Sequence, residues 1–274
     1  MNALKHAWIE GVAAANLTIG ALPSFQLRLD FLLSRLLKFG RLPGYNTGRA
    51  LQLKDGTTLH YRFNRGDLQS LREVFLEEVY ACELSFEVGT MLDLGANIGL
   101  TSVWMACRQR LHHAQSASFG PLYVVAVEPV QANADVAVKN FQANQVSGTV
   151  VCAAVGQRTG VVSFSVRAES NLGKIVSVAN HSDTISVPMV GIRELLEQFP
   201  NGTVDLVKMD IEGSENALLA KHTDWLANVR ALMIEWHDEI TPSPPLIQNL
   251  LSSGFHHRPM NAARQENLSL FVKA

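Results

Sequence analysis

The sequence predicts an α/β fold, a doubly wound and mostly parallel sheet of seven strands, preceded by a cap of helices and a hairpin. From about residue 90 onward, short and almost continuously apolar stretches alternate with amphipathic ones. This alternation is typical of a parallel sheet that helices cover on both faces. The first part of the chain lacks it. We therefore expect a cap over residues 1–88 and an α/β domain over residues 89–274.

The cap is expected to contain two helices and one β-hairpin. Residues 22–39 place leucines and a phenylalanine at helical spacing, with basic residues between them. We expect this helix to pack on the body of the protein, and a helix that lies on a membrane surface or binds a partner is the alternative. Residues 50–63 alternate around Asp55-Gly56 and predict the hairpin. Residues 67–80 predict the second helix.

The α/β domain is expected to contain strands at residues 90–94, 122–127, 149–153, 204–209, 230–235, 255–260 and 267–273. Amphipathic segments predict helices near residues 98–110, 130–143, 191–199, 214–222 and 244–253. The last two strands are joined by a connection too short for a helical crossover, so they should be antiparallel. Two alternating segments, Val161–Val166 and Thr184–Val190, predict a β insertion at about residues 160–190.

The composition excludes several classes of protein. The 274 residues carry a formal net charge of −2 without a basic stripe, so we expect no nucleic-acid partner. The three cysteines are scattered and form no C-x-x-C pair, which argues against zinc and disulfides and suits a cytoplasmic protein: Cys82, Cys107 and Cys152. No apolar run reaches the ~18 residues that a membrane span needs, and the apolar stretch 12–22 lacks the cleavage pattern of a signal peptide.

A glycine turn follows the first strand of the predicted sheet, in the stretch MLDLGANIG (91–99). Such a turn lets a ligand approach the backbone, and the helix that follows favours negative charge. The fingerprint for a dinucleotide is G-x-G-x-x-G, but here Asn97 stands where a pyrophosphate would need bare backbone. A smaller nucleoside with a carboxylate tail fits better, and a plain tight turn is the alternative. Glu128, after the second strand, suits hydrogen bonds to ribose hydroxyls.

Acidic residues gather where another apolar strand ends, in VDLVKMDIEGSE (204–215). Residues i and i+2 of a strand project to one side, so Asp210 and Glu212 should share a face, and so should Glu235 and His237. His237 is the first candidate for a general base, because its unperturbed pKa is near ~6.5, and Glu212 is the next candidate. Clustered carboxylates could also raise one another's pKa. Glu215 is expected only to start a helix.

A divalent cation could alternatively bind to Asp210, Glu212, Glu235 and His237, although we predict no metal site. Asp210 and Glu212 could instead cap the helix that follows them.

Taken together, these segments resemble the FkbM family of S-adenosylmethionine-dependent methyltransferases. The resemblance covers about residues 67–240 and rests on the order and spacing of REVFLEEVY (72–80), MLDLGANIGLTS (91–102), VVAVEPVQANADVAVKN (124–140), AAVG (153–156), VDLVKMDIEGSENALL (204–219) and ALMIEWHD (231–238). It implies a Rossmann-like class I methyltransferase fold, S-adenosylmethionine as cofactor, and O-methylation of a small metabolite or a glycan.

The resemblance also implies roles for individual residues. The methionine end of the cofactor would be lined by Asp93, Gly95, Asn97 and Gly99. Glu128 would hold the ribose, Asp210 would face the cofactor's amino end, and Glu212 would lie nearer the acceptor. Strand geometry, and not the resemblance, places Glu235 and His237 in the same crevice. The long loop at 108–121 and the segment VGIREL (190–195) depart from the family pattern and leave the acceptor undefined. A non-catalytic binding protein and a nicotinamide-dependent oxidoreductase are the alternative functions.

Overall fold

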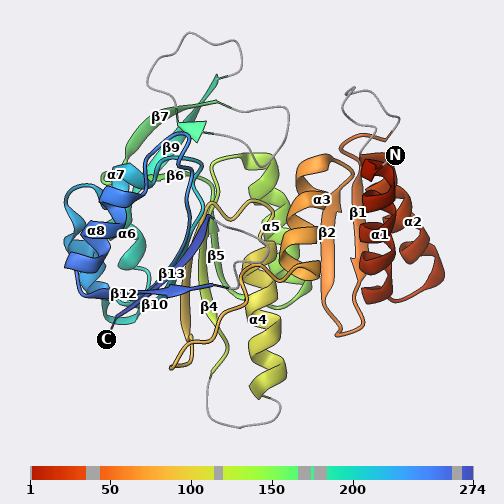
Figure 1. The fold of residues 1–274 in the computed structure, drawn as a ribbon, viewed down its shortest axis with the longest axis horizontal. Coiled ribbons are helices and arrows are strands. Elements are labelled where there is room, and N and C mark those ends of the chain that lie inside the picture. The colour runs from red at the N-terminus through yellow and green to blue at the C-terminus, as the bar shows by residue number, and fades with distance from the viewer. Residues whose placement is uncertain are drawn as a thin grey trace.

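The computed structural model describes residues 2–34, 44–113, 120–165, 174–175, 184–260 and 267–273. Its centre is a seven-stranded sheet in the order β12-β13-β11-β10-β3-β4-β5 (Figure 1). The strands are β3 (Thr90–Leu94), β4 (Tyr123–Val127), β5 (Ser147–Val151), β10 (Val204–Met209), β11 (Val229–Glu235), β12 (Phe255–Pro259) and β13 (Leu268–Lys273). β13 is antiparallel to both of its neighbours, whereas the five strands from β11 to β5 are mutually parallel. The predicted fold class is therefore confirmed.

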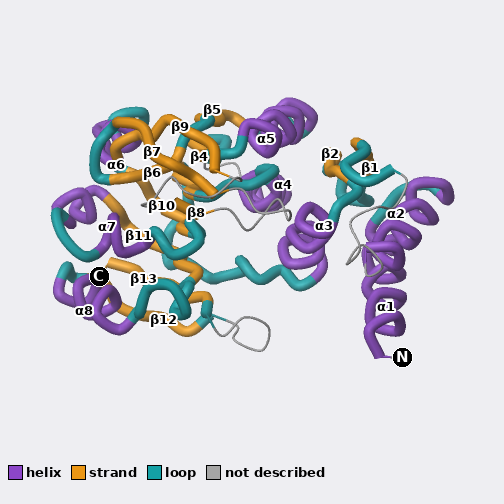
Figure 2. Tube along the Cα trace, turned by 90° about the horizontal axis from the view of Figure 1, so that it is seen from above, coloured by secondary structure: helices purple, strands orange, loops and turns teal. Residues whose placement is uncertain are grey.

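Helices cover both faces of this sheet, as Figure 2 shows. α4 (Leu100–His113) and α5 (Gln131–Ala143) lie on one face, and α6 (Ile192–Leu196), α7 (Glu215–Leu219) and α8 (Pro244–Ser252) lie on the other. Along β10, Leu206 belongs to the buried cluster of the first face and Val207 to that of the second. A strand that is buried on both sides has no polar face, which explains why these strands are almost continuously apolar in sequence.

Two helices are shorter than the sequence predicts. α6 ends at Leu196 instead of 199, and Pro200 then begins a 3₁₀ turn that runs to Gly202. α7 ends at Leu219 instead of 222, and the backbone turns at His222, which has a φ of 55°. Proline and a left-handed residue both interrupt helical hydrogen bonding, so amphipathic spacing overestimated these lengths.

The cap packs against the first face and shares its hydrophobic core. It consists of α1 (Asn2–Leu17), α2 (Ala21–Ser34), the hairpin β1 (Gly48–Gln52) and β2 (Thr58–Arg62), and α3 (Arg65–Leu71). Two buried asparagines attach the hairpin to α5: Asn140 lies within the helix and Asn144 is its C-cap residue. Asn140 exchanges hydrogen bonds with the backbone N–H and C=O of His60 at 2.6 and 2.9 Å, and Asn144 does the same with Thr58 at 2.8 and 2.6 Å. The two amides thus replace the strand that β2 lacks on this edge.

The cap differs in detail from the prediction. α1 was not expected, and the helix predicted at 22–39 is α2, which is described to Ser34, with 35–43 outside the described residues. The helix predicted at 67–80 starts at Arg65, where Asn64 Oδ1 accepts a hydrogen bond from Asp67 N at 2.7 Å. It continues as a π-helical turn over 72–76 and does not reach residue 80. None of the described helices is long and apolar enough to cross a bilayer.

The predicted β insertion is a separate four-stranded sheet in the order β6-β9-β7-β8. It contains β6 (Ala154–Gly156), β7 (Gly160–Ser165), β8 (Lys174–Ile175) and β9 (Thr184–Gly191). β7 and β9 pair antiparallel, which confirms the alternation expected for this segment.

Candidate active site

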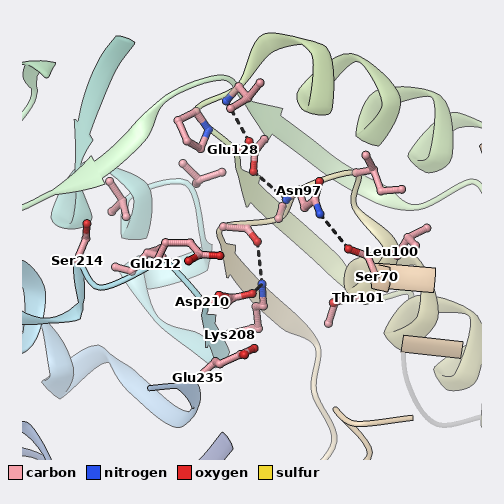
Figure 3. Close-up of a pocket in the computed structure, with 18 of the residues that line it drawn as sticks. Ser70, Asn97, Leu100, Thr101, Glu128, Lys208, Asp210, Glu212, Ser214 and Glu235 are labelled. Carbon is pink, nitrogen blue, oxygen red and sulfur yellow. Dashed lines mark hydrogen bonds and ion pairs between the residues drawn. The ribbon is translucent and has the colours of Figure 1, made fainter. Parts of the chain in front are cut away.

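A cavity of about 340 Å³ opens at the carboxyl ends of β3, β4, β10 and β11. Ligands bind at this edge in doubly wound sheets. Seven of the nine residues predicted from the sequence line it: Gly95, Asn97, Glu128, Asp210, Glu212, Glu235 and His237. The other two, Asp93 and Gly99, are not part of the lining. Figure 3 shows the acidic side chains and Lys208 gathered from separate strands around this space.

Hydrogen bonds hold the glycine turn after β3 in place, and Gly95 stands where no side chain fits. The N–H groups of Gly95 and Ala96 both donate to the carbonyl oxygen of Val127 at 3.0 Å, which ties the turn to β4. Gly95 has a φ of +76°, and a Cβ there would lie 1.7 Å from the carbonyl oxygen of Asp210. Gly99 has a different role, since a Cβ there would lie 3.1 Å from Ala137 on α5. Gly95 shapes the cavity, whereas Gly99 lets two helices pack.

Glu128 is buried, and three donors hold its carboxylate. Its Oε2 accepts from the backbone N of Asn97 at 2.9 Å (Figure 3). Its Oε1 accepts from Val130 N at 3.0 Å and from Asn133 Nδ2 at 3.1 Å. Burial raises the pKa of Glu128 to about 7, although these hydrogen bonds lower it. The carboxyl group therefore has a fixed orientation at the end of β4, where the sequence predicted a ribose contact.

A buried ion pair lies under the cavity and was missed in the sequence analysis. Lys208, on β10, places Nζ 3.4 Å from Asp93 Oδ1 and 3.5 Å from Asp210 Oδ2, and it donates to the carbonyl oxygen of Gly95 at 2.8 Å. Burial opposes a charge on Lys208, but Asp93 and Asp210 outweigh it and raise the pKa above its ordinary value. Ser102 Oγ donates to the other oxygen of Asp93 at 2.6 Å. Asp93 thus acts on the site through Lys208.

His237 lies among three carboxylates. Its Nδ1 is 3.0 Å from Glu215 Oε1, and its Nε2 is 3.7 Å from Asp210 Oδ1 and 3.6 Å from Glu212 Oε2. Burial lowers the pKa of His237, but the hydrogen bond with Glu215 and the surrounding negative charges raise it to about 9. The three carboxylates therefore favour the protonated imidazole. Because a protonated imidazole has no lone pair to accept a proton, these surroundings disfavour His237 as a base.

Glu215 differs from its predicted role. It does begin α7, as expected, but its side chain is 1% exposed and holds His237. Glu235 lies at the end of β11, where its Oε1 accepts from Asn267 Nδ2 at 3.2 Å. Burial and the charge of Asp210 raise the pKa of Glu235 to about 8, although His237 lowers it. This carboxyl is therefore mostly protonated at neutral pH.

Comparison with known families identifies the chain. Residues 93–256, more than half of the sequence, match the sequence model of the methyltransferase FkbM domain. The match includes the glycine turn, Glu128 and the cluster around His237. The chain belongs to the FkbM methyltransferase family. It is an S-adenosylmethionine-dependent methyltransferase.

Solved structures similar to this FkbM methyltransferase are distant. The FkbM methyltransferase of Methylobacillus flagellatus is 15% identical, with a TM-score of 0.36 over 96% of this chain and 58% of that one. The O-methyltransferase of Bacillus cereus in complex with SAH is 14% identical, with a TM-score of 0.37 over 75% and 96%. The human methyltransferase 10 domain containing protein is 12% identical, with a TM-score of 0.45 over 89% and 94%. A comparison with curated proteins finds no match.

The residues of the FkbM methyltransferase cavity fit S-adenosylmethionine chemically. The cofactor carries hydrogen-bond donors on its ribose and on its amino group, and the wall presents acceptors on Glu128 and Asp210. Asn97 Oδ1 is buried and has no hydrogen-bond partner among the described residues, so it can accept another donor. Leu100 and Thr101, at the start of α4, also line the cavity, where a helix N-terminus favours a carboxylate.

Proposed function

We propose that this protein transfers a methyl group to a hydroxyl of a small metabolite or a glycan. The observation that carries the proposal is the position of Glu212. Its carboxylate lies 3.6 Å from His237 Nε2 in the wall of the cavity, on the turn that joins β10 to α7. A hydroxyl acceptor must lose a proton as it is methylated, and a carboxylate at this place can take it.

The cofactor side of the cavity is assigned to the ends of β3, β4 and β10. Gly95 and Asn97 would border the methionine portion, Glu128 would accept from the ribose hydroxyls, and Asp210 would accept from the amino group. When bound, S-adenosylmethionine supplies a methyl group on a sulfonium sulfur, and the carbon–sulfur bond breaks as the acceptor oxygen bonds to the carbon. The fixed carboxylates of the chain contribute mainly by holding the two reactants in line, which can supply roughly 7–11 kcal/mol.

The proton is assigned to Glu212. The carboxylates around His237 raise its pKa and favour the protonated imidazole, which donates a hydrogen bond to the acceptor oxygen or to Glu212 instead of taking up the proton. Glu235, with its pKa raised to about 8, is also mostly neutral and can donate. Glu212 is then the base, and Glu235 and His237 orient the hydroxyl.

The acceptor is expected to bind between the cap and the β insertion. Ser70, Glu73 and Tyr80 line the cavity from the cap over residues 1–88, and Phe164 lines it from the insertion. Walls from both of these parts would bound the acceptor beside the cofactor, which suits a small molecule or one end of a glycan. The three free cysteines suit an enzyme of the reducing cytoplasm.

A transfer assay tests the proposal. Labelled S-adenosylmethionine is incubated with panels of hydroxylated metabolites and sugars, using wild-type protein and Glu212→Gln, while calorimetry measures S-adenosylhomocysteine binding to both. We expect Glu212→Gln to bind S-adenosylhomocysteine normally and to lose about 10²–10⁴-fold in transfer rate. Equal rates would contradict the role of Glu212, and methylation of amines in preference to hydroxyls would contradict the O-methylation. A protein that binds the cofactor but methylates no acceptor would favour a non-catalytic binding protein.

A further inference from the structure

Three potential ligand atoms from two neighbouring strand ends converge beside the cofactor cavity. They are Asp210 Oδ1, Glu212 Oε2 and His237 Nε2, and all lie within 4.8 Å of one another. We propose that these atoms bind one divalent cation and that this cation holds the oxygen of the methyl acceptor. The proposal rests on the methyltransferase function above and adds a metal site to it.

The distances suit a single ion. Ligand atoms bound to one cation at about 2.1 Å lie roughly 3.0 Å apart when adjacent and about 4.2 Å apart when opposite, in octahedral geometry. His237 Nε2 is 3.7 Å from Asp210 Oδ1 and 3.6 Å from Glu212 Oε2, which falls between these limits. Both distances are too long for hydrogen bonds but lie within ion-pair range, so Nε2 faces both carboxylates.

Glu215 provides an independent observation. Metal-binding histidines usually donate from their other ring nitrogen to a carboxylate, which fixes the ring orientation. His237 is about nine-tenths buried, and its Nδ1 lies 3.0 Å from Glu215 Oε1, on a side chain that is only 1% exposed. This contact directs Nε2 toward Asp210 and Glu212. A cation would displace the proton from Nε2, and His237 would then hold the acceptor through the cation instead of through a hydrogen bond. A buried carboxylate behind the ring is expected for a histidine ligand, and it is not needed for an imidazole that only pairs with surface acids.

The charges of the cavity point in the same direction. Two carboxylates and one imidazole surround the proposed cation position: Asp210, Glu212 and His237. Lys208 is shared by Asp93, Asp210 and the carbonyl oxygen of Gly95. The region around Glu212 therefore has an excess of negative charge that a divalent cation would balance.

The ligand set indicates a hard or borderline cation. Two carboxylate oxygens and one imidazole nitrogen suit Mn²⁺, with Mg²⁺ as the next candidate, and no thiolate is among the three ligand atoms. A cation here would lower the pKa of a hydroxyl bound to it. The O–H bond would then break, and its proton would pass to the Glu212 oxygen that does not bind the cation. The oxygen's electron pair would form the new bond to the methyl carbon as the carbon–sulfur bond breaks and its electron pair stays on the sulfur, which becomes a neutral thioether.

Mn²⁺ binding measured by electron paramagnetic resonance tests the proposal directly. Wild-type protein stripped with a chelator should bind one Mn²⁺ per chain, and Glu212→Gln should weaken this binding by at least tenfold. Glu215→Gln should weaken it by about 10- to 100-fold, because only the support behind the ring is lost. Glu73→Gln is the matched control, since it removes an acid from the same cavity without removing a ligand, and its affinity should stay within about twofold.

Two results of the binding measurement would overturn the metal site. One is wild-type protein that binds no Mn²⁺ at millimolar concentration, and the other is an equal loss of binding in Glu73→Gln and Glu212→Gln. Calorimetry with S-adenosylhomocysteine in the presence of chelator separates the two proposals and shows that each variant is folded. Normal cofactor binding and unchanged methyl transfer without any cation would reject the metal site and leave the methyltransferase intact. Loss of cofactor binding in wild-type protein would instead reject the assignment of the cavity.

Discussion

Replacement of Lys208 by methionine is expected to remove a large part of the protein's stability. Lys208 is 3% exposed and Asp93 is fully buried, and their charged atoms lie 3.4 Å apart. Methionine fills a similar volume but leaves Asp93 with only the hydrogen bond from Ser102. Removing one partner of a buried ion pair destabilises a protein by about 3–5 kcal/mol, because the other charge remains without compensation. A domain has only about 5–15 kcal/mol of total stability.

Urea denaturation at pH 7 measures this effect, and a double-mutant cycle gives its cause. Asp93→Asn removes the other charge, and the double variant Asp93→Asn/Lys208→Met removes both. If the two side chains stabilise each other, the double variant should be more stable than the sum of the single losses predicts, with a coupling free energy of about 1–3 kcal/mol. Strictly additive losses would refute the reasoning. The losses from Lys208→Met would then come from its contacts with Gly95 and Asp210.

Three further outcomes follow from the structure. Glu128→Gln should weaken the binding of S-adenosylhomocysteine by about 10- to 100-fold, because a hydrogen bond to a charged group contributes about 1.5–3 kcal/mol. Calorimetry measures this binding, and it should show no such loss for an analogue that lacks the ribose hydroxyls. Because the pKa of Glu128 is raised, the folded protein holds one more proton than the unfolded chain between pH 4.5 and about 7. The free energy of unfolding should therefore fall by up to about 3 kcal/mol as the pH rises through this range. Urea denaturation of Glu128→Gln should show a weaker dependence of this free energy on pH. Gly95→Ala should prevent cooperative thermal unfolding, because its Cβ would overlap the carbonyl oxygen of Asp210, and a normal melting curve would contradict this.

The sequence contains enough information to predict the sheet and the edge where the site lies. Strands such as β10 are apolar on both faces, and this pattern occurs only where helices cover a parallel sheet on both sides. The same strands end abruptly in acids, so Asp210 and Glu235 could be assigned to one crevice before their positions were known. Glu128 follows from the same argument at the end of β4.

The parts that were missed depend on contacts between distant residues. Lys208 is the one polar side chain within the apolar run from Leu206 to Met209, and a buried lysine there needs an acid nearby, so it was a usable signal. Glu215 gave no such signal. It lies 22 residues from His237, and the start of a short helix explains an acid equally well. The protonation of His237 could not be predicted either, because it depends on three carboxylates that only the fold brings together.

The register between β10 and β11 decides which of these groups meet. Met209 pairs with Ile234, so Asp210 and Glu235 are the next residues on adjacent parallel strands. A slip of one residue would turn the side chains of one strand to the opposite face and would put Glu235 among the apolar residues of a core. The buried residues Leu206 and Val207 prevent such a slip, because each packs into a different hydrophobic cluster. The chemistry of the site therefore depends on apolar residues that never touch a ligand. Substitutions that loosen their packing should change the titration of His237 before they unfold the protein.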